Sequence, residues 1–351
     1  MFSQTNSSDL PVLRRWLGGS ESHPLRRYFE YRRPDLHPAV VSAWWKSVIL
    51  VPVEQTLSIL EAVAPLGLDG KRRDFRAFTD MSEAGMQHFR THLAELTVAS
   101  QLAEGGVPFR FNTDEGPDLL LQYGQKTFGI EIGSRHPRSV SDLSHALIRG
   151  LRERGLPAAV SIRTDPVPPV TIRASVRDAV MQAFLPADGS LGVTSLRVEA
   201  APARPEDGIP ASWLSIQASR GNGYTTMSAP FKSPHVTAMA QDVASGVLRE
   251  KRKRRQAKLM PTVLIVNLSG GDLPDLRSWP EVFDALWETD DDFLAVGGMT
   301  ISTRSRVPEL RFSLNPFADQ LALDRVTALV SECGIFSDLT DQLTNKQRPT
   351  R

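Results

Sequence analysis

Two acidic residues interrupt the apolar strand candidates of residues 116–135, GPDLLLQYGQKTFGIEIGSR. Asp118 opens the run DLLLQY, and Glu131 lies between Ile130 and Ile132 in the next run. A carboxylate inside an apolar strand is costly unless it is paired or bound to a cation. Side chains alternate between the two faces of a strand, so neighbouring strands can bring both carboxylates together. Such groups repel each other, and a divalent cation with oxygen ligands relieves the repulsion.

A third acid, Glu95, stands beside the apolar residues Leu93 and Leu96 of a preceding helix candidate. A helix packed on the sheet could direct Glu95 toward the other two acids. Ordinary roles also fit the strand acids, because Asp118 follows a proline and suits a turn, and Glu131 suits the wet face of a one-sided sheet. These residues alone leave both interpretations open.

The segments around the three acids predict a helix followed by short strands. The helix, at about 82–104, carries an apolar stripe at helical spacing and ends at two glycines. Turn-rich TDEGP and GQ separate the strand candidates that follow it, at 108–112, 118–123 and 126–133.

After residue 235 the spacing of the apolar residues again predicts definite helices and strands. It predicts a helix at about 235–258, a strand at 261–269, a helix near 279–288 and two further strands, FLAVGGMTIST and LRFSLNP. The continuous apolar run TVLIVNL is typical of a strand that is covered on both faces. A central sheet between layers of helices is therefore expected.

The remaining segments give the domain organisation. Residues 1–80 read as a helical N-terminal region, and 136–235, with proline-rich connectors and mixed helix and strand, as an insertion. The α/β core is then expected to comprise residues 81–135 and 236–340.

This order of elements and acids resembles the PD-(D/E)xK, or restriction-endonuclease-like, nuclease superfamily. The matching residues are Glu95 on the helix, Pro117-Asp118 at the second strand and Glu131-Ile132-Gly133 on the third, and the resemblance covers about 82–135 and 235–315. It implies a restriction-endonuclease-like core with a mixed central sheet flanked by helices. It also implies that Asp118 and Glu131, with Glu95 through water, hold one or two Mg²⁺ or Mn²⁺ ions for phosphodiester hydrolysis.

One departure from the family pattern concerns the motif lysine, whose position is taken here by Gly133. Glycine supplies no ammonium to stabilise the charge that develops during cleavage. Arg135 would share the face of Glu131 if the strand continues, and it could stabilise charge without acting as a base. A lysine on the following helix, Lys251, Lys253 or Lys258, is the second candidate, and loss of cleavage is the third interpretation.

The run REKRKRRQAK at 249–258 carries seven positive side chains near the end of the predicted helix. It could bind the phosphates of a nucleic acid through Lys251, Lys253, Arg254 and Lys258, or it could be a solvated helix end that complements the helix dipole. Gln256 in the same run is a candidate to support the acidic site.

Composition limits the remaining alternatives. The chain has 351 residues, of which 41% are hydrophobic and 23% charged, with a formal net charge of +1, so a nucleic-acid surface must be local. A single cysteine, Cys333, excludes an internal disulfide and a cysteine-rich zinc cluster, in keeping with a cytoplasmic location. No apolar run approaches the roughly 20 residues of a membrane span, so no membrane partner is expected.

Three functions follow from these observations. The first is a metal-dependent nuclease, acting on DNA more readily than on RNA, in defence or repair. The second is an inactive nuclease-like fold that binds nucleic acid or a protein, and the third is an unrelated α/β scaffold with surface acids. The sequence leaves open whether a second copy of the chain or a partner subunit completes the site.

Overall fold

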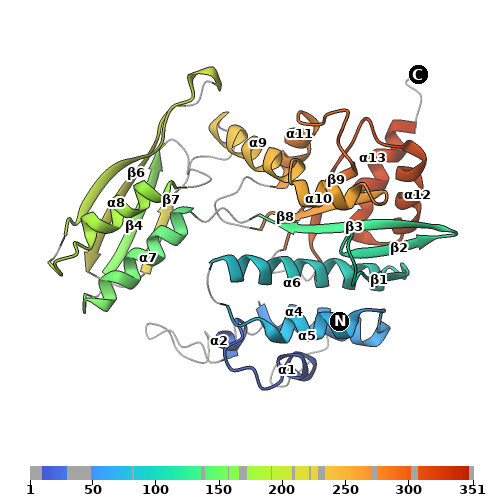
Figure 1. Cartoon of the computed structure of the whole chain (residues 1–351), viewed down its shortest axis with the longest axis horizontal. Helices are drawn as coiled ribbons and strands as arrows, with labels where there is room; N and C mark the ends of the chain where they lie inside the picture. Colours follow the sequence, from blue (N-terminus) through green and yellow to red (C-terminus); the bar gives the residue numbers. More distant parts are fainter. Residues whose placement is uncertain are drawn as a thin grey trace, which may run out of the picture. The chain divides into compact units, whose positions relative to one another are not determined.

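The structure is a computed structural model of the whole chain (Figure 1). It describes residues 10–29, 49–80, 83–135, 139–156, 158–165, 172–190, 192–207, 210–220, 223–227, 234–269, 276–301 and 307–347. The chain divides into two compact units. The first comprises residues 1–135, 247–269 and 279–351, and the second comprises 136–246 and 270–278.

A mixed six-stranded sheet forms the centre of the first unit, with the strand order β1-β2-β3-β8-β9-β10. Strands β3 and β8 and strands β8 and β9 pair in parallel, and the other neighbours pair antiparallel. The strand bounds are β1 Phe109–Phe111, β2 Leu119–Tyr123, β3 Lys126–Ser134, β8 Thr262–Asn267, β9 Phe293–Thr300 and β10 Glu309–Leu314. This arrangement confirms the predicted α/β class with a mixed sheet.

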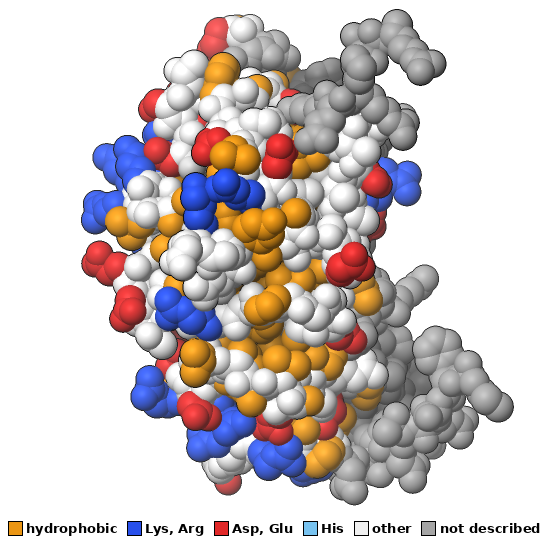
Figure 2. Space-filling model, turned by 90° about the vertical axis from the view of Figure 1, so that its right-hand side faces the viewer, with side chains coloured by type: hydrophobic (Ala, Val, Ile, Leu, Met, Phe, Trp, Pro, Cys, Tyr) orange, Lys and Arg blue, Asp and Glu red, His pale blue; other side chains and the backbone are white. Residues whose placement is uncertain are grey.

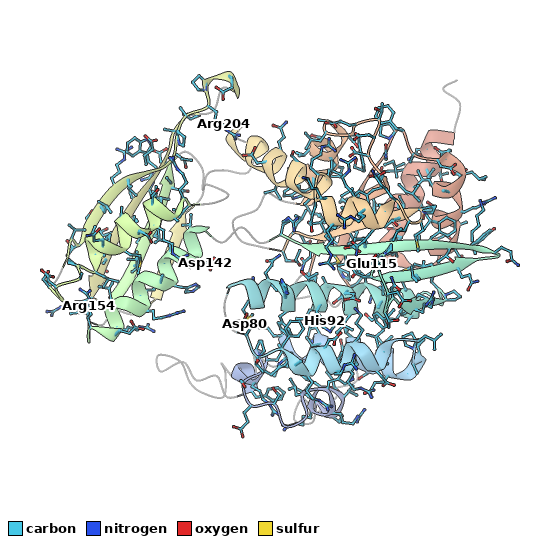
Figure 3. The ribbon with its side chains drawn as sticks, in the orientation of Figure 1. Asp80, His92, Glu115, Asp142, Arg154 and Arg204 are labelled. Carbon is cyan, nitrogen blue, oxygen red and sulfur yellow. The ribbon has the colours of Figure 1, made fainter. Side chains whose placement is uncertain are left out.

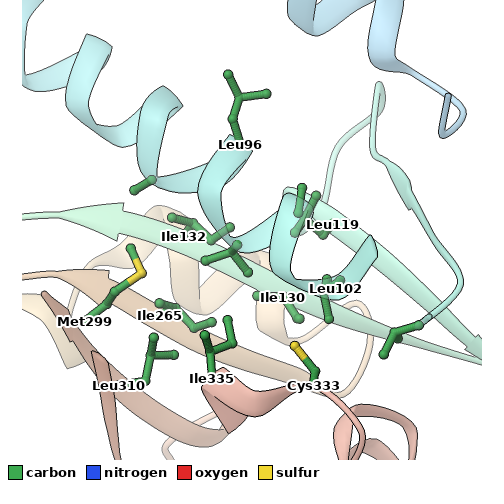
Figure 4. Close-up of a cluster of buried hydrophobic side chains, with 14 of the residues drawn as sticks. Leu96, Leu102, Leu119, Ile130, Ile132, Ile265, Met299, Leu310, Cys333 and Ile335 are labelled. Atoms are coloured by element: carbon green, nitrogen blue, oxygen red, sulfur yellow. The ribbon is translucent and has the colours of Figure 1, made fainter. Parts of the chain in front are cut away.

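Helices flank this sheet, and two of them matter for the acids. Helix α6, Glu83–Glu104, packs its apolar stripe against the side of the sheet that carries Ile130 and Ile132, where they join a large buried cluster (Figure 4). Helix α10, Lys251–Ala257, lies on the other side of β3 (Figure 1). The remaining helices of the C-terminal part are α11 Trp279–Asp284, α12 Gln320–Val330 and α13 Ser337–Gln347.

The N-terminal helices pack beneath α6 and belong to the first unit. Their buried residues are part of the same apolar cluster as the sheet, so this region does not form a core of its own. The helices are α1 Pro11–Leu17, α2 Arg26–Phe29, α4 Val51–Val63 and α5 Leu68–Ala77. The helical interpretation is thus confirmed for these residues, while 30–48 lie outside the described residues.

The single helix predicted at 235–258 is wrong, because the structure has two. Helix α9, Pro234–Leu248, ends before α10 begins, and Glu250 between them has an extended backbone with ψ of 105°. The predicted helical segment is thus interrupted at Glu250. Strand β8 is buried at every residue, as expected for a strand covered on both faces.

The second unit is a four-stranded sheet in the order β5-β6-β4-β7 with two helices. Its core lies between the helices and alternating residues of β4, β5 and β6. The elements are α7 Ser139–Glu153, β4 Ala158–Asp165, α8 Ala174–Phe184, β5 Ser195–Ala201, β6 Ser212–Arg220 and β7 Gly223–Met227. The unit begins at the start of the predicted insertion, residue 136, and continues eleven residues beyond its predicted end at 235, to Gly246.

None of the helices formed by the described residues is both long enough and apolar enough to cross a membrane.

Candidate functional site

Asp118 and Glu131 lie close together where β2 and β3 meet. The last ladder pair is Leu119 with Ile130, and Asp118 and Glu131 are the next residues beyond it, Asp118 just before the start of β2. The negative charge of Asp118 acts on Glu131, so the two carboxylates are near neighbours. The Oδ2 atom of Asp118 also accepts a hydrogen bond of 2.7 Å from the backbone N–H of Ile132, which fixes the Asp118 carboxylate against β3.

Glu131 is buried and pairs with Lys253 of α10. The Nζ atom of Lys253 lies 2.5 Å from Oε1 of Glu131 and donates a second hydrogen bond of 2.8 Å to the backbone carbonyl of Ile132. The side chain of Lys253 is 11% exposed and that of Glu131 is 3% exposed, so the pair is almost fully desolvated. Of the lysine candidates on this helix, Lys253 is the one that enters the acidic site.

Gly133 makes room for this lysine. A Cβ atom at position 133 would lie 3.3 Å from Cε of Lys253, slightly closer than ordinary van der Waals contact, and 3.4 Å from its Nζ. The ammonium of Lys253 therefore occupies the space into which a side chain at position 133 would extend. Since Gly133 and Glu131 are two residues apart on one strand, that space adjoins the Glu131 carboxylate.

The loop that carries Asp118 is held from the same helix. The Nε2 atom of Gln256 donates a 2.8 Å hydrogen bond to the carbonyl of Gly116. Pro117 packs over Gly129 so closely that a Cβ atom at position 129 would lie 2.3 Å from its Cγ. Lys253 and Gln256, three residues apart on one face of α10, thus fix both Glu131 and the start of β2.

Glu95 comes from α6 and pairs with a different lysine. Its Oε1 atom forms an ion pair with Nζ of Lys71 in α5, and its Oε2 atom lies 3.8 Å from Nδ1 of His92. His92 lies on α6 (Figure 3) and packs against the rings of Phe75 and Phe78. Glu95 is buried, so this carboxylate too is almost fully desolvated.

The negative charge of Asp118 acts on both buried glutamates, Glu131 and Glu95. Burial raises the pKa of Glu131 to about 7 and that of Glu95 to about 8, and in both cases the negative charge of Asp118 is the next largest cause. The ammonium groups of Lys253 and Lys71 act in the opposite direction. Asp118 is therefore close enough to both glutamates to repel their ionised forms.

Metal binding can be assessed from these contacts. Within the described residues, no three His, Cys, Asp or Glu side chains are gathered so that they could hold a metal ion together. Glu131 and Glu95 each turn one oxygen to a lysine instead. The second oxygen of Glu131, Oε2, is nevertheless buried without a hydrogen-bond partner among the described residues. An unpartnered carboxylate oxygen beside a second carboxylate suits a hard cation.

Arg135, the other predicted replacement for the motif lysine, points elsewhere. Its guanidinium pairs with Glu250 and donates a hydrogen bond of 3.1 Å to the carbonyl of Ser134. The structure thus brings Asp118, Glu131 and Lys253 together and places Arg135 on a neighbouring ion pair.

The basic run on α10 divides between inward and outward positions. Lys253 is buried, and Arg254 is bound to Asp290 and Asp292, whereas Lys251 and Lys258 are exposed. Arg252 and Arg255 are exposed as well. On the molecular face drawn in Figure 2, Lys and Arg side chains alternate with Asp and Glu and form no continuous patch.

Lys71 is the residue of this site that the sequence did not indicate. It belongs to the segment GKRRDFR, in which several cations stand at neighbouring positions of an amphipathic helix. No motif distinguishes the lysine that turns inward from the arginines that stay near the surface. Only the packing of α5 on α6 reveals it.

Comparison of the chain with protein-family models, with curated proteins and with solved structures finds no match. The case for a function therefore depends on the residues and contacts described above.

Proposed function

We propose that this protein is a divalent-metal-dependent nuclease that hydrolyses phosphodiester bonds, with DNA as the preferred substrate, in a role such as defence or repair. The observation that carries the proposal is the position of Lys253. Its ammonium contacts Glu131 and fills the space left by Gly133. The motif lysine that the strand lacks at Gly133 would thus be replaced by Lys253, a lysine of helix α10.

Each residue has a chemical role in this proposal. Asp118 and Glu131 would hold Mg²⁺ or Mn²⁺, and Glu95 would contribute through a water molecule. The bound ion would acidify the attacking water and neutralise charge on the phosphate. Lys253, held by Glu131 and by the Ile132 carbonyl, is oriented to stabilise the negative charge that develops in the transition state.

Substrate binding is assigned to the outer side of α10. Lys251, Arg252, Arg255 and Lys258 are exposed on the same short helix that carries Lys253. Cations at these positions would contact the phosphates on either side of the scissile bond without reading the bases. Affinity should then fall steeply with salt, and replacing two of these cations should lower the slope of that dependence by about two.

The test is a cleavage assay on supercoiled plasmid, linear duplex, single-stranded DNA and RNA, with Mg²⁺, with Mn²⁺ and with a chelator. We expect cleavage only with a divalent ion, and a loss of at least about 100-fold in Asp118→Asn and in Glu131→Gln. Glu309→Gln is the matched control, because Glu309 pairs with Arg311 at the far edge of the sheet.

Equal turnover by wild type and both acid variants would refute the nuclease proposal. The alternative, an inactive nuclease-like fold that binds nucleic acid or a protein, is favoured by the lack of a ready three-residue metal group among the described residues. It predicts salt-dependent DNA binding with no cleavage under any metal condition.

A further inference from the structure

We propose that Lys71 occupies the place of a second cation beside Glu95, so that the site takes one divalent ion, on the Asp118 and Glu131 side. The inference rests on the proposed metal-dependent function and adds to it a residue from the N-terminal helices. Lys71 touches neither of the other two acids in any described contact, so it is a positioning residue.

The ammonium group of Lys71 is held in place by its neighbours. Its side chain is 16% exposed, its Nζ atom is paired with Oε1 of Glu95, and the same Nζ lies 5.6 Å from the centre of the Phe111 ring. An ammonium held between a buried carboxylate and an aromatic face is stabilised by both. Lys71 therefore places a positive charge beside Glu95 whenever that carboxylate is ionised, as a bound cation would do.

The charges around Asp118 support a single ion. Three carboxylates, from Glu95, Asp118 and Glu131, face two ammonium groups, from Lys71 and Lys253, and the ionised cluster carries one net negative charge. One divalent ion reverses that sign. A second would be added to a cluster that is already positive, in a buried region where like charges repel strongly.

Each lysine forms an ion pair with the Oε1 atom of its glutamate, and among the described residues neither Glu131 Oε2 nor Glu95 Oε1 accepts a hydrogen bond. Glu131 keeps Oε2 buried without a partner among the described residues, so it can bind an ion while Lys253 stays on Oε1. Glu95 has Lys71 on Oε1 and His92 near Oε2. The ammonium of Lys71 lies against Oε1 of Glu95, so an ion at that oxygen would have to displace it, and we give Glu95 the indirect role through water.

The experiment is Mn²⁺ titration of the full chain without nucleic acid, with free Mn²⁺ followed by electron paramagnetic resonance and heat by calorimetry. We expect one ion per chain in wild type and in Lys71→Arg, none in Asp118→Asn, and two in Lys71→Met. The double variant Lys71→Met/Glu95→Gln, which removes both charges of the pair, should return to one. If Lys71→Met does not fold because Glu95 is left unpaired, the double variant should still fold, so comparing the two variants separates loss of folding from loss of ion binding.

The outcomes separate the two proposals. Two ions in wild type, or one ion in a folded Lys71→Met, would overturn the role of Lys71 and leave the nuclease proposal standing. No bound Mn²⁺ in wild type would overturn the metal-dependent function itself, and the inference with it. One ion in wild type and two in Lys71→Met would support both.

Discussion

The two lysine–glutamate pairs on either side of β3 look alike but are built differently. Lys253 contacts Glu131 and the carbonyl of Ile132, both in β3, and Asp118 is hydrogen-bonded to the same strand. Lys71 contacts Glu95 and the face of Phe111, away from that strand. Both pairs are desolvated, yet only Lys253 has its ammonium on the strand that carries the motif acids.

This difference separates a chemical role from a positioning role. A cation that shares the strand of the motif acids can act on a phosphate bound there, whereas a cation held by an aromatic ring on the other side can only fix the charge of its partner. Removing Lys253 should therefore affect turnover most, and removing Lys71 should affect stability and ion binding most.

The largest expected effect is the loss of stability in Lys71→Met. Removing one partner of a buried pair leaves the other charge uncompensated, and such changes cost about 3–5 kcal/mol. Urea unfolding at pH 9 should show this loss. Burial and Asp118 raise the pKa of Glu95 to about 8 in the wild type, and removing Lys71, which lowers this pKa, raises it further, so the variant must either bury an unpaired charge or keep Glu95 protonated at high pH. At pH 6 Glu95 can take up a proton, so the cost should be smaller.

Lys71→Met/Glu95→Gln is the matched control for that measurement. With both charges gone, the double variant should recover most of the lost stability and should show little difference between pH 6 and pH 9. A double variant as unstable as the single one would mean that Lys71 stabilises the fold by packing and not by its charge.

The next effect is on turnover, in Lys253→Met. Loss of one group that stabilises developing charge lowers kcat by about 100- to 1000-fold. Single-turnover cleavage at saturating Mg²⁺ should show this drop, whereas Arg135→Met, whose side chain is paired with Glu250, should lose far less. Similar losses in both variants would mean that Arg135 shares the role.

A lysine introduced at position 133 tests whether an ammonium group from the strand can replace the ammonium group that Lys253 supplies from α10. The space beyond Gly133 is the space that the Lys253 ammonium fills. Gly133→Lys in the Lys253→Met background should therefore regain about tenfold or more of the lost activity, since a positioned ammonium is worth several kcal/mol. In the wild-type background the same change should be harmful, because two ammonium groups would compete for one site.

Sequence patterns predicted the strand acids and their elements well. Asp118 and Glu131 could be expected close together because turn chemistry fixes the register of a short hairpin, although Asp118 lies one residue before β2 and not within it. The replacement lysine could be narrowed to a helix but not to one residue, because the expected helix is broken at Glu250, and this changes which of its residues face the sheet. Lys71 could not be found, since its role depends on how two helices pack.

A third effect concerns pH. Burial, and then the charge of Asp118, raise the pKa of Glu131 from 4.5 to about 7. A cation binds only the ionised carboxylate, so Mn²⁺ affinity should rise with pH up to about pH 7, by at most about tenfold per unit for one released proton. Without metal, the folded state binds this proton more tightly than the unfolded chain, so its contribution to stability should fall as pH rises from 4.5 to 7.

Calorimetry in two buffers of different ionisation heat measures the protons released on Mn²⁺ binding. Asp118→Asn, which keeps the shape of the side chain but removes its charge, should lower the pKa of Glu131, and a metal-free NMR titration of the Glu131 carboxyl group would show the shift. A Glu131 pKa that is unchanged in this variant would contradict the assignment of Asp118 as a neighbour of Glu131.

The smallest effect is expected for Gly133→Ala, and it probes the space around Lys253 most finely. The added Cβ would lie 3.3 Å from Cε of Lys253, so the end of a flexible side chain must move by a few tenths of an ångström. Overpacking of a rigid core costs about 1–3 kcal/mol, and a lysine end should yield for less than about 1 kcal/mol. Turnover should then fall only a few-fold, and Gly133→Leu should lose much more because it displaces the ammonium itself. Gly246→Ala is the control, since its Cβ would meet nothing within 4 Å. A Gly133→Leu variant as active as wild type would show that Lys253 does not need the space beside Glu131. Lys253 would then be a positioning residue, as Lys71 is.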